Sequence, residues 1–393
     1  MPANLEPTET VAAYLERVRA ICPAVEEAAS RIEEARRLPP DIVELLRSAG
    51  MFSVAVPREW GGLELDPIST CQAIELLAAA DGSAAWCAMI GCDTGFASAH
   101  LEDSCAREVW TDPLHASVFV ANPTGVATVA EGGYSVTGRW TFASGSTHAP
   151  VYALGCLTMT GSGPRMATQT VPEVRMVVLP AAQAEVIDTW TTTGLRGSGS
   201  HDVAVSSAFV PEGHTFVMAP SAVKREGPLW RYVMLFATKL APVALGITRA
   251  AIDDVVAMAA SKRSLGDRAS IQDQQWLQLA IARAEIGHGQ ARAFYYESLS
   301  TVWDELLAGG MPARESQARL YAAQIGAVER CVEVVDAMYK AAGSAALYAP
   351  AALDRRLRDV HTIYQHTACS PNWLAEMGQV FLGAHPNMSM LIR

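Results

Sequence analysis

The stretch Tyr134-Ser-Val-Thr-Gly-Arg-Trp-Thr-Phe-Ala-Ser-Gly-Ser-Thr-His-Ala149 lies in the middle third of the 393-residue chain and decides which folds are open to it. Side chains alternate with period two over residues 134–142, which is typical of a strand, and Gly132-Gly133 before them indicate a tight turn. No helix-length segment separates the neighbouring β-rich runs, which argues against a parallel Rossmann sheet. The pattern instead predicts an antiparallel β-barrel or sandwich, with further strands at 116–120, 151–159, 174–180, 184–190 and 202–210.

Helical patterns lie on both sides of this β-rich region. Residues 8–112 predict several helices, among them 67–80 and 83–99. Residues 229–384 predict a bundle of long helices at 230–261, 271–309 and 314–342, closed by a short helix at 371–383. The sequence therefore predicts an α+β protein with an N-terminal helical domain (1–114), a central β domain (115–222) and a C-terminal helical bundle (223–393).

Composition excludes several classes of function. The chain has 30 basic and 41 acidic residues, a formal net charge of −11, which argues against a nucleic-acid partner. The longest apolar stretch, 233–252, is interrupted by Lys239, Pro242 and Arg249, so it does not predict a membrane span. Eight scattered cysteines without a CxxC pair indicate a reducing compartment, and the N-terminus does not resemble a secretory signal. We therefore expect a cytoplasmic location and no membrane partner.

Common cofactor and metal motifs are missing from the sequence. There is no GxGxxG after a strand, and Gly194-Leu-Arg-Gly-Ser-Gly199 lies between two predicted strands, where a turn is expected. His361 and His366 are separated by roughly 140° on a helix, which is a poor arrangement for two ligands of one metal. We therefore predict no metal site.

Four segments resemble the acyl-CoA dehydrogenase family, and they occur in that family's order. Residues 138–149 resemble its flavin-facing strand, and 193–202 with 209–212 resemble its Gly-Leu/Met-Arg turn and the strand that follows. Residues 262–266, with Gln274 downstream, resemble its flavin-phosphate segment, and 342–359 resemble the last part of its bundle. The resemblance extends from about residue 15 to residue 384 and implies the acyl-CoA dehydrogenase-like fold with a C-terminal four-helix bundle.

The base that such dehydrogenases require is missing. One branch of the family carries it in a Tyr-Glu-Gly triplet, and the matching residues here are Tyr364-Gln365-His366. A neutral amide cannot remove an α-proton near pH 7. The other branch carries a Glu on the first long helix of the bundle, but no Glu lies between Glu226 and Glu285, and Asp253 and Asp254 are expected to be surface charges.

These departures resemble a sister group, the oxygenase components of two-component (group D) flavin-dependent monooxygenases. The segments 140–145 and 358–366 are similar to that group. The resemblance implies reduced FMN or FAD supplied by a separate NAD(P)H:flavin reductase. It also implies that O2 forms a C4a-hydroperoxyflavin, which hydroxylates or N- or S-oxygenates a small organic substrate. The lack of a nicotinamide-binding segment agrees with this division of labour.

The resemblance also implies roles for individual residues. Ser144 would bond flavin N5, His366 would exchange a proton near the flavin, and His148 is a further catalytic candidate, although a surface, capping or structural role is the alternative for each. Trp86, Ile90 and Cys92 would line the substrate pocket or belong to the core. An interface-crossing phosphate contact from Arg263 or Lys262 implies a homotetramer. The residues implied to bind flavin are Asn122, Phe142, Ser144, Arg196, Lys262, Arg263 and Gly343.

Two other functions remain open from the sequence. The chain could be a dehydrogenase or oxidase of acyl thioesters with a displaced base, or a flavin-fold binding subunit without turnover. A preference for reduced over oxidised flavin separates the monooxygenase from the dehydrogenase. Failure to bind any flavin would favour the non-catalytic subunit.

Overall fold

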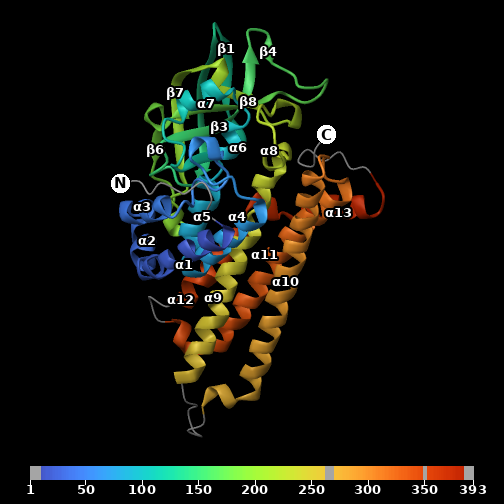
Figure 1. The fold of residues 1–393 in the computed structure, drawn as a ribbon. Coiled ribbons are helices and arrows are strands. Elements are labelled where there is room, and N and C mark those ends of the chain that lie inside the picture. Colours follow the sequence, from blue (N-terminus) through green and yellow to red (C-terminus); the bar gives the residue numbers. More distant parts are fainter. Residues whose placement is uncertain (1–9, 262–269, 348–351, 385–393) are drawn as a thin grey trace.

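The structure, a computed structural model, describes residues 10–261, 270–347 and 352–384. The strands lie at one end of the molecule and the long C-terminal helices extend away from them, with the N-terminal helices against their junction (Figure 1). One connected hydrophobic core includes residues from all three regions. This arrangement confirms the predicted acyl-CoA dehydrogenase-like α+β fold.

Seven helices make up the described N-terminal region. Local capping explains where several begin: the side chain of Asp66 accepts a hydrogen bond from the Ser69 amide, and that of Asp81 accepts one from the Ala84 amide. The predicted helix 83–99 is divided in two, since the chain turns at Cys92 and Asp93. The helices are α1 (Val11–Glu27), α2 (Ala29–Ala35), α3 (Pro40–Ser48), α4 (Pro67–Ala80), α5 (Gly82–Gly91), α6 (Thr94–Ser98) and α7 (Asp103–Val109).

The central region is one mixed sheet with the strand order β6-β7-β2-β1-β3-β5-β8, and β4 pairs with β3. The predicted antiparallel arrangement holds for every pair except β1 and β3, which run parallel. The hairpin partner β2 occupies one edge of β1, so β3 joins the other edge after the 144–150 connection. The strands are β1 (Ser117–Ala130), β2 (Gly133–Ala143), β3 (Val151–Thr160), β4 (Gly163–Pro164), β5 (Val174–Pro180), β6 (Glu185–Ile187), β7 (His201–Pro211) and β8 (Thr215–Val217).

The C-terminal helices form the bundle. The predicted helix 230–261 is broken into α8 (Pro228–Arg231), a 3-10 segment (Val233–Thr238) and α9 (Leu240–Ser261). The long helices α9 and α10 both pack against α11, as do α12 and α13. Their bounds are α10 (Gln275–Leu307), α11 (Arg314–Ala342), α12 (Ala352–Tyr364) and α13 (Pro371–Phe381).

Helix α5 lies where the three regions meet. It contacts α4 and α9, strand β1, helix α12 and the 3-10 turn Arg196–Ser198. Its residues are small or apolar, and most are buried. Side chains on α5 can therefore reach the sheet and the end of the bundle at once. None of the helices described is long and apolar enough to cross a bilayer.

Candidate active site

Trp86 on α5 joins two of the predicted catalytic residues. Its indole Nε1 donates a hydrogen bond of 2.9 Å to Ser144 Oγ, at the end of β2. Its ring also meets the ring of His366 edge-on, with centroids 5.6 Å apart. Ser144, Trp86 and His366 come from the three regions of the chain, so the fold assembles them in one place.

Ser144 begins a chain of buried hydroxyl groups. Its Oγ lies 2.7 Å from Ser200 Oγ, which lies 2.7 Å from Ser198 Oγ. Ser198 Oγ in turn donates to the Leu195 carbonyl at 2.7 Å. All three serines are buried. We call Ser144, Ser200 and Ser198 the serine chain.

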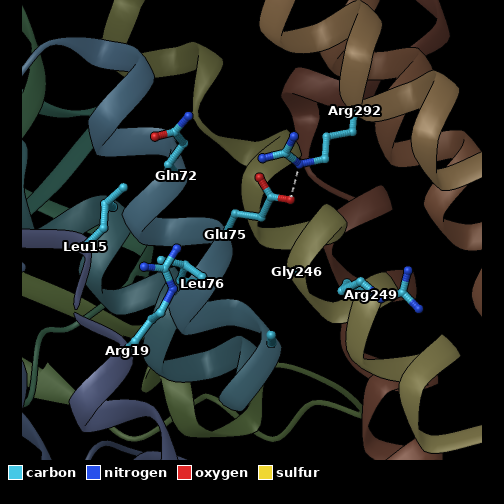
Figure 2. A pocket seen from close by; sticks show the side chains of 9 residues that line it. Leu15, Arg19, Gln72, Glu75, Leu76, Gly246, Arg249 and Arg292 are labelled. Atoms are coloured by element: carbon cyan, nitrogen blue, oxygen red, sulfur yellow. Dashed lines mark hydrogen bonds and ion pairs between the residues drawn. The ribbon is translucent and has the colours of Figure 1, made fainter. Parts of the chain in front are cut away.

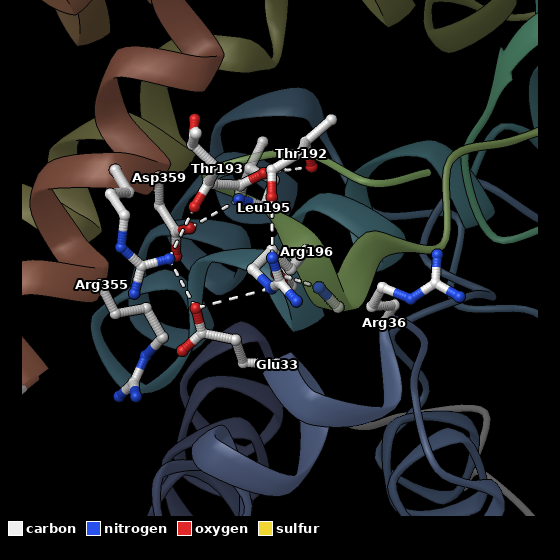
Figure 3. Close-up of polar contacts among 12 residues, drawn as sticks. Glu33, Arg36, Thr192, Thr193, Leu195, Arg196, Arg355 and Asp359 are labelled. Atoms are coloured by element: carbon white, nitrogen blue, oxygen red, sulfur yellow. Dashed lines mark hydrogen bonds and ion pairs between the residues drawn. The ribbon is translucent and has the colours of Figure 1, made fainter. Parts of the chain in front are cut away.

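A strained turn at Leu195 carries Ser198, the far end of the serine chain. Leu195 has a left-handed backbone with φ of 46°, which costs a non-glycine residue about 1–2 kcal/mol. Asp359 on α12 secures the turn by accepting a 2.6 Å hydrogen bond from the Leu195 amide, and Trp190 Nε1 donates to the Leu195 carbonyl at 2.9 Å. Figure 3 shows Asp359 directed at Leu195 from the bundle side.

Asp359 and Asp81 form a buried acidic pair behind the turn. Burial raises the pKa of Asp359 to about 7, and the Asp81 carboxylate adds to the rise. Burial raises the pKa of Asp81 to about 6. Arg355 lies 3.8 Å from Asp81 and offsets part of the cost of burying the two carboxyl groups. The pair supports two parts of the site. Asp359 holds the Leu195 turn, and Asp81 caps α5.

His366 follows α12 and caps the next 3-10 turn, Thr367–Cys369. Its Nδ1 accepts a hydrogen bond of 3.2 Å from the Ala368 amide. Although the side chain reaches solvent, protein surrounds it closely enough that desolvation lowers its pKa to about 4. The imidazole is therefore neutral at pH 7. With Nδ1 accepting, the ring proton sits on Nε2, so His366 presents a hydrogen-bond donor.

Phe142 and His148 flank Ser144 on either side in sequence. Phe142 has a left-handed backbone with φ of 60° and keeps 69% of its surface exposed, and its ring forms a T-shaped pair with that of Trp190. Both ring nitrogens of His148 are buried without a hydrogen-bond partner among the described residues. Burial lowers the pKa of His148 to about 4. An exposed aromatic face, unpartnered ring nitrogens and a hydroxyl fit a planar ring with polar edges, as a flavin has.

The remaining predicted flavin contacts that the structure describes lie on strand β1, on the 3-10 turn Arg196–Ser198 and at the end of α11. Asn122, expected in a loop, is an exposed residue of β1 where the register with β3 shifts. The Arg196 guanidinium donates to the Thr192 carbonyl and faces Glu33 of α2 (Figure 3). Gly343 ends α11 with a left-handed φ of 58°. Lys262 and Arg263 lie outside the described residues.

Two predicted pocket residues differ in their surroundings. Ile90 is half-buried on α5. Cys92 is buried: its thiol donates to the Met89 carbonyl and accepts from Lys239 Nζ at 3.2 Å. Lys239 also pairs with buried Asp93 at 2.5 Å, which raises the pKa of Lys239 against the opposing effect of burial. Cys92 thus belongs to an ion-pair cluster beneath α5, and its role as a pocket residue stays a prediction.

A separate hollow of about 270 Å³ lies between α1, α4, α9 and α10 (Figure 2). Its charged side chains already have partners: Arg292 pairs with Glu75, and Arg249 pairs with Asp253 and Glu285. None of the predicted site residues lines it. It is therefore not the predicted active site.

Comparisons with known proteins identify the family of this chain. The family models "Acyl-CoA dehydrogenase, N-terminal domain" and "Acyl-CoA dehydrogenase, C-terminal domain" match residues 8–106 and 238–371. The indole-3-acetate monooxygenase of Pseudomonas putida is 32% identical over 355 residues, covering 89% of each chain. This chain belongs to the oxygenase branch of the acyl-CoA dehydrogenase family.

Other relatives of this oxygenase carry similar names. The flavin-dependent monooxygenase oxygenase subunit HsaA of Rhodococcus jostii is 27% identical over 91% of this chain and 94% of its own. The crystal structure of the HsaA monooxygenase from M. tuberculosis superposes with a TM-score of 0.89, at 25% identity over 98% of this chain and all of that one. The resemblance inferred from the four sequence segments is confirmed.

Sequence reasoning missed the support around Ser144 in this oxygenase. Ser198 and Ser200 lie in the segment interpreted only as a turn, and their alternation about Gly199 was the available signal. Asp254, expected to be a surface charge, instead binds buried Arg356 at 2.6 Å. Asp253 is exposed and pairs with Arg249, as expected of a surface charge.

Proposed function

We propose that this chain is the oxygenase component of a two-component flavin-dependent monooxygenase. It takes reduced FMN or FAD from a separate NAD(P)H:flavin reductase and uses O2 to oxygenate a small organic substrate. The observation that carries the proposal is the meeting of Ser144, Trp86 and His366, and no carboxylate of the described residues forms a hydrogen bond or ion pair with these three. Gln365 is exposed at the end of α12.

The residues around Ser144 would hold the flavin. Ser144 offers a hydroxyl oxygen to its polar edge, Phe142 an aromatic surface and His148 two unpartnered nitrogens. Asn122, Arg196, Lys262, Arg263 and Gly343 remain proposed contacts for the rest of the cofactor. When bound, reduced flavin supplies the electrons that activate O2. His366 donates from Nε2 to an oxygen atom in the pocket, and Trp86 fixes both His366 and Ser144.

We further propose an aromatic substrate. Trp86 and half-buried Ile90 provide an apolar wall at the site. Relatives are named indole-3-acetate monooxygenase and p-hydroxyphenylacetate 3-hydroxylase, and both named compounds carry an aromatic ring. Indole-3-acetate is the first compound to test, followed by p-hydroxyphenylacetate.

Anaerobic binding followed by oxygen tests the proposal. Reduced FMN and FAD should bind more tightly than their oxidised forms. Mixing the reduced complex with ¹⁸O2 and indole-3-acetate should place one ¹⁸O atom in a product detected by mass spectrometry. Acyl-CoA thioesters should leave bound oxidised flavin unbleached. Rapid bleaching by an acyl-CoA without ¹⁸O transfer would favour the dehydrogenase, and failure to bind any flavin would favour the non-catalytic subunit.

We also propose that the oxygenase is a cytoplasmic homotetramer. All eight cysteines are free thiols, in keeping with a reducing compartment. Helix α10 exposes large apolar side chains at Trp276, Leu279, Ile286 and Phe294, and their spacing places them on one face. Such a face is expected to be covered by another copy of the chain. Light scattering measures the assembly directly.

A further inference from the structure

The serine chain holds one proton per hydroxyl, which fixes the direction of its hydrogen bonds. Ser198 Oγ donates its hydrogen to the Leu195 carbonyl, which can only accept. The proton between Ser198 and Ser200 must therefore come from Ser200. By the same reasoning, the proton between Ser200 and Ser144 must come from Ser144.

The Ser144 hydroxyl can form one more hydrogen bond, and only as an acceptor. Its proton is directed to Ser200, and one of its two lone pairs accepts from Trp86 Nε1. A hydroxyl oxygen has two lone pairs, so one is free. In this state Ser144 can accept a hydrogen bond from a ligand but has no proton to donate.

We propose that Ser200 and Ser198 are positioning residues that select the reduced flavin by keeping Ser144 an acceptor. The proposal rests on the proposed function, in which the polar edge of the flavin at Ser144 is taken to be its N5 edge, as the family resemblance implies. Reduced flavin carries a hydrogen on N5 and can donate it to Ser144. Oxidised flavin has only a lone pair on N5, which would face the lone pair of Ser144.

The hydrogen bonds of the serine chain could also run in the opposite direction, but that arrangement is less favourable. If Ser198 donated to Ser200, and Ser200 to Ser144, then Ser144 could donate to the oxidised ring. The Leu195 carbonyl would still accept from Trp190 Nε1 and from the Ser198 amide at 3.0 Å. It would, however, lose the Ser198 hydroxyl, and two oxygen atoms would face each other at 2.7 Å without a proton between them. The chain therefore favours the reduced cofactor without excluding the oxidised one.

Binding constants for both oxidation states test the proposal without reference to turnover. Wild-type protein should bind reduced FMN or FAD more tightly, so its bound flavin should have a higher midpoint potential than free flavin. Ser200→Ala frees the Ser144 proton. The dissociation constant of the oxidised flavin should then fall about threefold to tenfold, the effect of one net hydrogen bond, while that of the reduced form changes little. A tenfold change lowers the two-electron potential by about 30 mV.

Two further variants complete the design. Ser198→Ala removes the donor at the far end and should also tighten oxidised-flavin binding, so it serves if Ser200→Ala does not fold. Ser146→Ala is the matched control, because Ser146 is buried in the same region but donates to the Gly199 carbonyl, outside the chain.

The outcomes separate the two proposals. Equal weakening of both oxidation states in Ser200→Ala or Ser198→Ala would show a merely structural role and overturn the inference. A wild-type potential at or below that of free flavin would also overturn it, whatever the variants do. Both results leave the monooxygenase proposal standing if ¹⁸O transfer is observed. Failure of wild-type protein to bind flavin would remove both proposals.

Discussion

His366 owes its chemistry to one backbone hydrogen bond. Because Nδ1 accepts from the Ala368 amide, the ring is held against Trp86 with its proton on Nε2. The sequence left two tasks open for this residue, donating a hydrogen bond or accepting a proton. The pKa of about 4 and the capping contact favour donation by a neutral ring.

Replacing His366 distinguishes the two tasks. His366→Ala should lower product formation about a hundredfold or more, the usual contribution of a positioned acid–base group. Hydrogen peroxide should rise in step, because O2 still reacts with reduced flavin. His366→Gln restores an amide donor near the Nε2 position and should recover part of the lost activity. The measurement is product and peroxide formed per reduced flavin oxidised, from pH 6 to 8, and the wild-type yield should show no His366 ionisation there.

His361→Ala is the control for these variants. His361 is exposed and pairs with Asp336 at 2.9 Å, so its loss should leave the yield unchanged. Equal loss in His366→Gln and His366→Ala would indicate a base rather than a donor. Loss in His361→Ala alone would show that His366 had been wrongly assigned.

The centre of the candidate site could be predicted from the sequence, but its support could not. Ser144 and His366 match family motifs, and Trp86 lies on a predicted helix, so motif and periodicity sufficed. Ser198 and Ser200 lie at an irregular turn, where their alternation about Gly199 is too short a pattern to indicate the direction of a side chain. Their hydroxyl groups meet Ser144 on a turn that is held by residues distant in the sequence, Ser83 and Asp359.

At the scale of elements, regular segments with clear end signals were the best predicted. The helix 67–80 agrees with α4, 314–342 with α11, and the strand 174–180 with β5. The errors lie where tertiary contacts override local pattern. The helices 83–99 and 230–261 are both broken near residues that form one buried cluster, Asp93 and Lys239. The domain boundaries at 114 and 222 stay predictions.

That ion pair joins the end of α5 to the start of α9, and its removal should be costly. Lys239→Met leaves Asp93 buried without its cation, which typically destabilises a protein by about 3–5 kcal/mol. Urea unfolding at pH 7 measures the change. Adding Asp93→Asn to Lys239→Met removes the stranded charge and should restore part of the stability.

Arg249→Ala is the matched control, because Arg249 pairs with partly exposed Asp253 and Glu285 on the same helix system. Its loss should cost less than about 1 kcal/mol. A loss for Lys239→Met as small as that of Arg249→Ala would show that the buried pair does not hold the two helices together.

At the scale of the whole molecule, buried histidines should make the fold sensitive to acid. Burial lowers the pKa of His100 and His148 to about 4, and also lowers those of His201 and His288. The pKa of His366 is lowered in the same way, to about 4. Between pH 6.5 and 4 these histidines are protonated in the unfolded chain but stay neutral in the folded protein. The free energy of unfolding therefore falls as pH falls. The raised pKa values of Asp81, Asp93 and Asp359 act in the opposite direction, and we expect these three carboxyl groups to offset only part of the effect of the five histidines.

The melting temperature should therefore drop between pH 7 and 4.5, with net proton uptake on unfolding. His100→Gln removes one of the ionisable rings and should flatten the decline. The exposed His361→Gln should leave it unchanged. A melting temperature that is constant or rises over this range would contradict the assignment of His100 as a buried neutral ring.

The hydrogen bond from the Leu195 amide to Asp359 joins residues 164 positions apart and has a consequence for biosynthesis. A ribosome that adds about 5–20 residues per second needs roughly 20–70 s to reach Asp359. Until then the Leu195 amide lacks its partner, and the strained turn is held only by contacts from earlier residues, such as the hydrogen bonds from Trp190 Nε1 to the Leu195 carbonyl and from the Gly197 amide to Ser83. Nascent chains released before Asp359 should therefore contain the sheet but have a less ordered flavin site.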